Sequence, residues 1–126
     1  MAMSIYYTAI RKRTLDKEER ERVQSIVDMY CAKFPFENKH EDFCLYKEPF
    51  DEPNIVLDGA TRIPWIRSIF YDVIVYWLKC LTELTMLLSD CEWKARLDDV
   101  SLIWEDRTGW RLPTDEEYAA AKKKQS

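Results

Sequence analysis

The sequence predicts an α+β fold in which two helices pack on one face of a mainly antiparallel sheet. Three observations lead to this class. One long central segment repeats apolar residues at helical spacing, a capping pattern near the N-terminus marks a second helix, and the last third alternates apolar and polar residues with a period of two. Because the chain has 126 residues, we expect a single α+β domain over residues 1–126 with one substantial core.

The first expected elements are a strand and a helix. Residues 4–10 (SIYYTAI) are rich in β-branched and aromatic side chains, which is typical of a strand. Asp16 and Glu19 have the spacing of a capping box, and their charges suit the positive end of a helix. The helix is expected to end near Ala32. Its apolar face consists of Val23, Ile26, Val27, Tyr30 and Phe34.

Two short strands are expected between the two helices. Pro35 ends the first helix, and Phe43–Lys47 is a short strand candidate after a polar stretch. The segment Asn54–Asp58 (NIVLD) is predicted as the next strand, ended by Gly59.

The central helix is predicted over Trp65–Ser89, with Pro64 in its first turn, where proline is tolerated. Three of its charged residues, Asp72, Lys79 and Glu83, share one stripe opposite the apolar face. Charged groups near the centre of a bilayer would cost roughly 2.5–3.5 kcal/mol each, so a membrane span is excluded and the helix is expected to lie against the sheet. The buried face consists of Ile66, Phe70, Val73, Ile74, Trp77, Leu81, Leu84 and Leu88.

After the central helix the pattern becomes that of strands. Apolar side chains from Trp93 to Leu97 alternate with charged ones, as in a half-buried strand. A further strand is expected over residues 100–104. A hairpin loop over Glu105–Gly109 and a returning strand over residues 110–112 follow it.

A short terminal helix is predicted from a second capping-box pattern, formed by Thr114 and Glu117. Tyr118 is expected to dock it on the rest of the fold, since so short a helix would otherwise fray. The resulting order is β-α-β-β-α-β with a C-terminal β-hairpin extension and this terminal helix. That order fits the split βαβ arrangement called ferredoxin-like.

Composition limits the classes of function. The net charge of −4 argues against general nucleic-acid binding, which needs a basic surface. The four cysteines form no CxxC pair and the chain has one histidine, so we expect reduced, largely buried thiols and no metal site or other cofactor. The N-terminal stretch lacks the features of an export signal, which favours a cytoplasmic protein.

Few residues are candidates for catalysis. His40 lies in an acidic loop and is expected to be an ordinary surface histidine. Asp98 and Asp99 are interpreted as turn residues rather than a paired catalytic site, because strand neighbours point to opposite faces. Neither a phosphate-binding loop nor a nucleophile motif is present. The sequence therefore favours a binding protein over an enzyme.

The strongest functional signal is the concentration of tryptophans among acidic residues in the last third. Aromatic anchors ringed by carboxylates are typical of an interface for a basic protein, although core packing would also explain some of them. Trp104 and Trp110 flank the predicted hairpin loop and are expected to be cross-strand neighbours. The predicted protein-binding residues are Trp104, Glu105, Asp106, Trp110, Asp98 and Asp99.

Three hypotheses follow from these patterns. The first is a small acidic protein-binding module without catalytic activity, such as a stoichiometric inhibitor or the immunity protein of a bacterial toxin. The second is a small-molecule-binding protein or enzyme with a pocket on the sheet, in which His40, Asp98 and Asp99 supply polar groups and Trp93 or Tyr76 lines the wall. The third is a homodimer in which the hairpin joins a neighbour's sheet edge.

Overall fold

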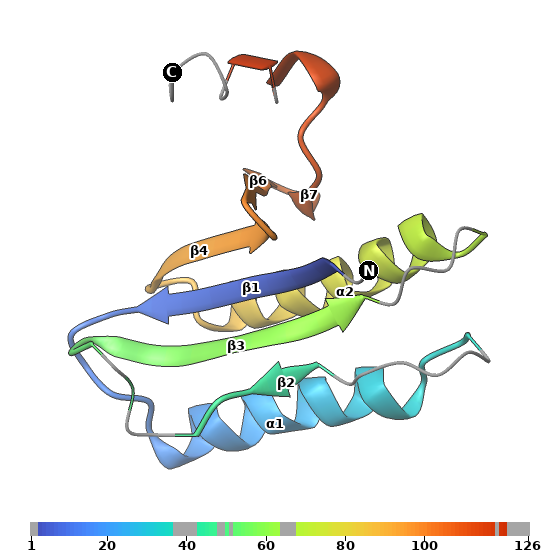
Figure 1. Cartoon of the computed structure of the whole chain (residues 1–126). Helices are drawn as coiled ribbons and strands as arrows, with labels where there is room; N and C mark the ends of the chain where they lie inside the picture. The colour runs from blue at the N-terminus through green and yellow to red at the C-terminus, as the bar shows by residue number, and fades with distance from the viewer. Residues whose placement is uncertain are drawn as a thin grey trace.

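A computed structural model describes residues 3–36, 43–47, 50, 52–63, 68–117 and 119–120. Two long helices lie along the strands of a twisted sheet, and the last strands continue into a C-terminal segment that extends from the body (Figure 1). The elements are β1 (Met3–Ile10), α1 (Lys17–Ala32), β2 (Cys44–Leu45), β3 (Ile55–Ile63), α2 (Phe70–Leu87), β4 (Glu92–Leu97), β5 (Val100–Ser101), β6 (Ile103–Glu105) and β7 (Gly109–Arg111).

The main sheet has five strands in the order β2-β3-β1-β4-β5, and all of its pairings are antiparallel. This confirms the predicted α+β class with a mainly antiparallel sheet. The strand order differs from the four-stranded order that was predicted, because a fifth strand lies at the β4 edge. Asp98 has a φ of +51°, and the turn at Asp98 and Asp99 brings the chain back for only two residues.

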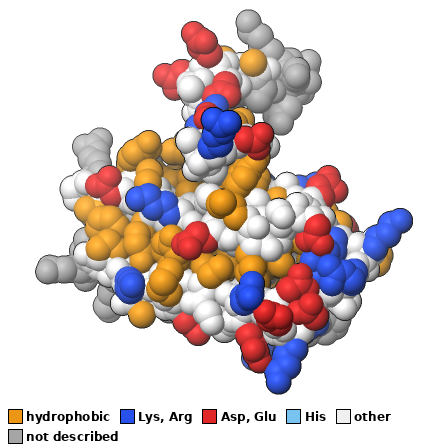
Figure 2. Space-filling view, turned by 180° about the vertical axis from the view of Figure 1, so that it is seen from behind, with side chains coloured by type: hydrophobic (Ala, Val, Ile, Leu, Met, Phe, Trp, Pro, Cys, Tyr) orange, Lys and Arg blue, Asp and Glu red, His pale blue; other side chains and the backbone are white. Residues whose placement is uncertain are grey.

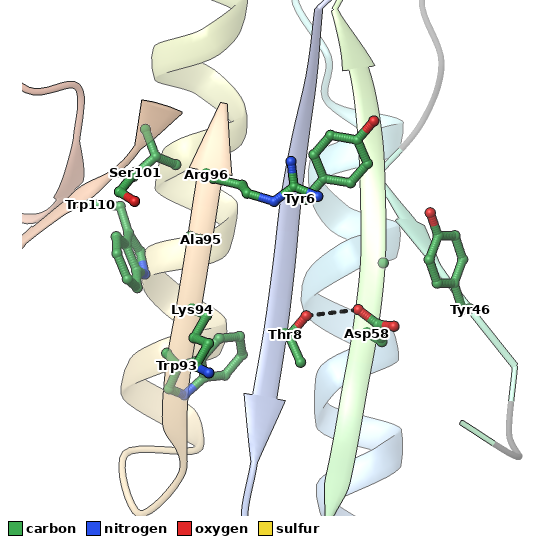
Figure 3. Close-up of a pocket in the computed structure, with 12 residues that line it drawn as sticks. Tyr6, Thr8, Tyr46, Asp58, Trp93, Lys94, Ala95, Arg96, Ser101 and Trp110 are labelled. Carbon is green, nitrogen blue, oxygen red and sulfur yellow. Dashed lines mark hydrogen bonds between the residues drawn. The ribbon is translucent and has the colours of Figure 1, made fainter. Parts of the chain in front are cut away.

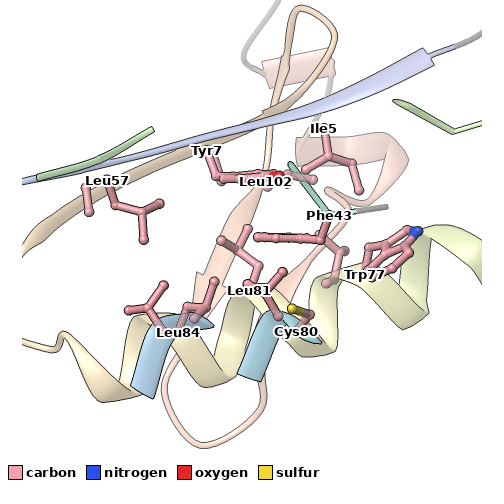
Figure 4. Close-up of a cluster of buried hydrophobic side chains, with 14 of the residues drawn as sticks. Ile5, Tyr7, Phe43, Leu57, Trp77, Cys80, Leu81, Leu84 and Leu102 are labelled. Atoms are coloured by element: carbon pink, nitrogen blue, oxygen red, sulfur yellow. The ribbon is translucent and has the colours of Figure 1, made fainter. Parts of the chain in front are cut away.

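Both helices pack on the sheet face that carries Ile5, Tyr7 and Ala9, and their side chains form the core (Figure 4). These β1 residues alternate with half-buried ones, as the period of two requires. In α2, the residues of the predicted buried face from Val73 to Leu88 are buried, so this helix does lie against the sheet. Trp77 is fully buried there and stacks on Phe34 of the chain after α1.

Helix α1 begins where the capping box predicts. The Asp16 carboxylate accepts a hydrogen bond from the Glu19 backbone N–H at 2.8 Å, and the Glu19 carboxylate accepts one from the Asp16 N–H at 3.0 Å. Glu19 also binds Arg11, the residue after β1, whose side chain is 5% exposed. The start of α1 is therefore fixed to the end of the central strand.

Helix α2 is shorter at both ends than the predicted Trp65–Ser89. It begins at Phe70 and ends at Leu87, while residues 64–67, with the predicted proline, lie outside the described part of the chain. Ile69 precedes it without a side-chain cap. Among the described helices, none combines the length and apolar character needed to cross a membrane.

Strand β3 corrects the prediction that Gly59 ends it. The strand continues to Ile63, and Gly59 lies inside it because the chain is crowded there. A Cβ at this position would collide with the carbonyl oxygen of Cys44 and lie 2.6 Å from the Tyr7 ring. Beside it, β2 spans two residues instead of the predicted Phe43–Lys47.

The Tyr7 hydroxyl connects three strands at this crowded point. It donates to the Cys44 carbonyl in β2 at 2.7 Å and shares a hydrogen bond with the Thr61 hydroxyl in β3 at 2.9 Å. Its ring stacks on Phe43, with centroids 4.2 Å apart. The short edge strand is thus held by a side chain of the central strand.

The predicted strand over residues 100–104 is instead two strands that separate at Leu102. The Leu102 N–H still bonds to the Ala95 carbonyl at 3.0 Å, and its side chain is buried. Beyond it, β6 pairs with β7 as a separate two-stranded hairpin. Thr114 and Glu117 form the predicted second capping box, and the following residues 115–117 are helical. Tyr118, the predicted docking residue, lies outside the described part.

Candidate partner-binding groove

The hairpin β6–β7 packs on α2 and donates hydrogen bonds to two threonines of that helix. The Trp110 backbone N–H donates to the Thr82 hydroxyl at 3.1 Å, and the Trp110 indole N–H donates to the Thr85 hydroxyl at 2.9 Å. Gly109 has a φ of +98° and lies so close that a Cβ would collide with the Thr82 side chain. The hairpin therefore lies directly on the helix.

A hollow of about 520 Å³ lies between this hairpin, the C-terminal end of α2 and the start of β4. We call it the tryptophan groove. Its lining includes Met86, Cys91, Trp93, Trp104, Asp106 and Trp110. Trp104 and Met86 are among the most exposed large apolar side chains of the described residues, with 36% and 66% exposed. In the space-filling view, hydrophobic side chains gather on the body below the projecting C-terminal segment (Figure 2).

Each of the three tryptophans is positioned by a different element. Trp93 comes from β4, and its indole N–H donates to the Leu88 carbonyl at the end of α2 at 3.0 Å. Trp104 and Trp110 are cross-strand partners in the hairpin, as predicted, with ring centroids 5.4 Å apart and planes at 64°. Three different strands of the last third of the chain thus place three indoles in one hollow.

The two acidic residues of the hairpin have different surroundings. Asp106 lines the groove, and its carboxylate accepts a hydrogen bond from the Trp104 indole at 3.2 Å. Glu105 instead pairs with Arg111, which also binds Glu117 at 2.8 Å. The Arg111 guanidinium and the Thr114 N–H lower the pKa of Glu117 to about 2. Glu105 is therefore used within the chain rather than presented to a partner.

The predicted site residues separate into two groups. Trp104, Asp106 and Trp110 line one groove, and Glu105 belongs to the same hairpin. Asp98 and Asp99 lie in the β4–β5 turn and are not part of the groove lining. Asp98 is a turn residue, as predicted, but its carboxylate accepts a hydrogen bond from the distant Ser4 backbone N–H of β1 at 2.9 Å.

A second hollow, of about 600 Å³, opens on the sheet face that carries no helix (Figure 3). Across it, the Arg96 guanidinium lies 4.1 Å from the centre of the Tyr6 ring, and Thr8 donates to Asp58 at 2.8 Å. Lys94 also lines it. This hollow already contains a cation on an aromatic ring and a bonded carboxylate.

The polar residues of the pocket hypothesis do not gather in this sheet hollow. Asp98 and Asp99 are absent from its lining, and His40 lies outside the described residues. Tyr76 is in an aromatic cluster between the helices, where its hydroxyl donates to the Tyr30 carbonyl at 2.7 Å. Trp93 does line the hollow, as one alternative of that hypothesis required.

Sequence reasoning missed Asp58 in the sheet hollow and Met86 and Cys91 in the groove. Asp58 could have been found, since it faces Thr8 across the β1–β3 pairing and points away from the core. Met86 could also have been placed on the exposed side of α2, because it continues the polar stripe of Asp72, Lys79 and Glu83 at helical spacing. Cys91 has no comparable signal, since its position depends on the turn after α2.

The four cysteines are free thiols, but the prediction that they are largely buried is wrong: Cys80 is buried, Cys31 and Cys91 are half-buried, and Cys44 is exposed. Burial raises the pKa of Cys80, which lies in the core, and also that of Cys91. The Cys80 and Cys91 thiols therefore stay protonated and unreactive near neutral pH. Among the described residues, no group of three His, Cys, Asp or Glu side chains could hold a metal ion.

No protein-family model, curated protein or solved structure matches this chain.

Proposed function

We propose that this chain is a non-catalytic protein-binding module that docks a basic protein partner in the tryptophan groove. In this proposal it acts as a stoichiometric inhibitor of the toxin–immunity type. The observation that carries the proposal is the combination of three indoles, an exposed methionine and one carboxylate in a single hollow beside a projecting hairpin. Aromatic side chains and methionine are enriched at the centre of protein interfaces, and tryptophan is among the commonest binding hot spots.

Charge supports a basic partner. The chain carries a net charge of −4, and among the described residues that line the groove Asp106 is the charged one. Complementary charge speeds association and excludes acidic partners. The hairpin also carries Arg107 and Arg111, but neither is part of the described groove lining, and Arg111 is paired with Glu105 and Glu117.

The experiment is affinity purification from the native host with matched variants. Trp104→Ala and Asp106→Ala alter the groove, while Tyr71→Ala removes an aromatic side chain that is 64% exposed outside it. We expect the wild type and Tyr71→Ala to retain one partner at a one-to-one ratio, and the groove variants to lose it. A partner that all four proteins retain equally would refute the groove as the docking site.

A ligand-binding role for the sheet hollow is the second candidate. It is favoured by the hollow's size and by Lys94, Arg96 and Tyr6, which together suit an anionic aromatic molecule. A ligand screen followed by Lys94→Ala separates the candidates, because this variant leaves the tryptophan groove intact. Unchanged ligand affinity in Lys94→Ala would count against this second role.

Two finer assignments belong with this proposal. We propose that the sheet is a ferredoxin-like arrangement extended by β5, an idea supported by the neighbouring positions of β2, β3, β1 and β4. An experimental structure with a strand parallel to β1 beside it would contradict this. We also propose a cytoplasmic location, supported by the free thiols, which fractionation of the native host would test.

A further inference from the structure

The three indoles of the tryptophan groove have all committed their N–H groups to acceptors within the chain. Trp93 donates to the Leu88 carbonyl, Trp110 to the Thr85 hydroxyl and Trp104 to Asp106. An indole has one N–H donor and no acceptor. What the rings offer an incoming group is therefore their carbon surface and π electrons, and not a hydrogen-bond donor.

Apart from the Thr85 and Ser89 hydroxyls, the remaining polar group of the described groove lining is the Asp106 carboxylate. Asp106 accepts the Trp104 N–H through Oδ1, which leaves the capacity of its second oxygen for another donor. No lysine or arginine is part of the described groove lining. A phosphate, a carboxylate or a carbonyl would find few donors there, whereas a cation would meet the negative face of an aromatic ring and a carboxylate together.

The chain contains its own example of this chemistry on the sheet face. There, the Arg96 guanidinium covers the Tyr6 ring at 4.1 Å (Figure 3). In the groove, the same kinds of group are present without a cation among the described residues. Trp104 is 36% exposed, so its ring surface is accessible to a side chain from another molecule.

We propose that the tryptophan groove is an aromatic cage for one arginine side chain of the protein partner. This inference rests on the proposed function, because the partner supplies the arginine. The guanidinium lies on the free surface of Trp104 and donates to Asp106, while Met86 and Trp93 contact the aliphatic part of the side chain. Arginine fits better than lysine, since its planar group stacks on an aromatic ring and donates to a carboxylate in one orientation.

The probe is N-acetyl-arginine amide, and its matched control is N-acetyl-citrulline amide, which has nearly the same shape without the charge. Binding is followed by NMR through the indole N–H signals of the ¹⁵N-labelled protein. We expect the arginine compound to shift the signals of Trp104 and Trp110 in a saturable way. The citrulline compound should shift them little at the same concentration.

Variants test which groups hold the arginine. Asp106→Asn should weaken the arginine compound on the order of fivefold, and Trp104→Leu should abolish its saturable effect on the Trp110 signal. Tyr71→Leu is the control, because it changes an exposed aromatic residue outside the groove. The indole signals that remain in each variant show whether it is folded.

The outcomes separate this inference from the proposed function. Equal binding of the arginine and citrulline compounds, or no shift of the Trp104 and Trp110 signals, would overturn the aromatic cage. If Trp104→Leu nevertheless loses the protein partner, the groove is still the docking site and only the arginine assignment is wrong. If the arginine compound binds as expected but the partner is retained by Trp104→Leu, the cage stands and the proposed docking site is wrong.

Discussion

Helix α1 and the C-terminal helical turn are each tied to the strand before them by an arginine that binds the glutamate of a capping box. Arg11 follows β1 and binds Glu19 at 2.6 Å, while Arg111 ends β7 and binds Glu117 at 2.8 Å. In both, the guanidinium is the main cause that lowers the pKa of the glutamate to about 2. The local device is the same at both ends of the chain.

The two junctions differ in burial and in the number of partners. The Arg11 side chain is 5% exposed and also binds Asp90 and the carbonyls of Arg13 and Thr14. The Arg111 side chain is 34% exposed. Because water screens exposed pairs, the same sequence pattern gives a structural anchor in one place and a weak tether in the other. Tertiary burial, rather than the motif, decides its strength.

Replacing Arg11 gives the largest expected effect. Arg11→Met removes the nearer cation of the Glu19 and Asp90 carboxylates, which then keep only the more distant and exposed Arg13, and it removes bonds to two carbonyls. We expect a loss of about 3 kcal/mol in the free energy of unfolding, near the lower end for breaking a buried pair because Asp90 is half exposed. Urea unfolding followed by circular dichroism measures it.

Arg111→Met is the matched control for this first prediction. Its unfolding midpoint should be indistinguishable from that of the wild type, since the pair it breaks is partly exposed. Faster hydrogen exchange is expected at the Thr114 N–H, because it donates to the Glu117 carboxylate that Arg111 holds. Equal destabilisation by the two variants would contradict the distinction between anchor and tether.

The contact between the β6–β7 hairpin and α2 gives the next largest expected effect, because it holds the C-terminal region more firmly than the Arg111 pair does. Gly109→Ala would force a Cβ into the Thr82 side chain at a φ of +98°. We expect a loss of about 2 kcal/mol from strain and overpacking. Thermal unfolding measures the change. If Gly109→Ala destabilises the Thr82→Ala variant less than it destabilises the wild type, the collision is confirmed. Neutral behaviour of Gly109→Ala would place the hairpin away from α2.

The two caps should differ in the same direction as the two arginines. Asp16→Ala removes the acceptor of the Glu19 N–H and should cost about 1 kcal/mol, the usual value for a helix cap. Thr114→Ala removes the equivalent acceptor of the Glu117 N–H but should leave the unfolding midpoint unchanged, because the turn it caps is exposed. Chemical denaturation of both variants under identical conditions tests this, and a larger effect at Thr114 would reverse the ranking.

The last prediction concerns acid stability, where the difference between a Glu19 variant and the wild type shrinks as the pH falls. The pKa of Glu19 is lowered from 4.5 to about 2, mainly by Arg11, so its stabilisation is complete above about pH 4.5 and is lost as the pH falls through about 2. The stability of Glu19→Gln should therefore depend less on pH between these limits than that of the wild type. Denaturant titrations across the range measure this, and parallel pH profiles would contradict it.

Much of the fold could be predicted because its signals are local. The apolar face of α2, the capping box at Asp16 and the cross-strand pair of Trp104 and Trp110 each depend on residues within a few positions of one another. Such local patterns predict the structure correctly here, since the tertiary structure buries the helix and strand faces that the patterns define. For the same reason Asp98 was correctly interpreted as a turn residue.

What could not be predicted depends on contacts between distant segments. Gly59 suggested the end of a strand, yet it lies within β3 because Tyr7 and Cys44 crowd that position. Nothing near Trp93 indicates that it shares a hollow with Met86 and Trp104. The sequence identified tryptophans and acids as a group, but only the packing of the hairpin on α2 separates Asp106 from Glu105.

The position of Tyr7 also limits the alkaline tolerance of the whole sheet. Burial raises the pKa of this phenol well above its usual value of 10.0, so the folded chain keeps it protonated where an unfolded chain would not. Its contribution to stability is complete below about pH 10 and declines above it, because the unfolded state gains by releasing the proton. In strong base, the phenolate would lose its hydrogen bond to Cys44, and the outer strand would be the first part of the sheet to detach.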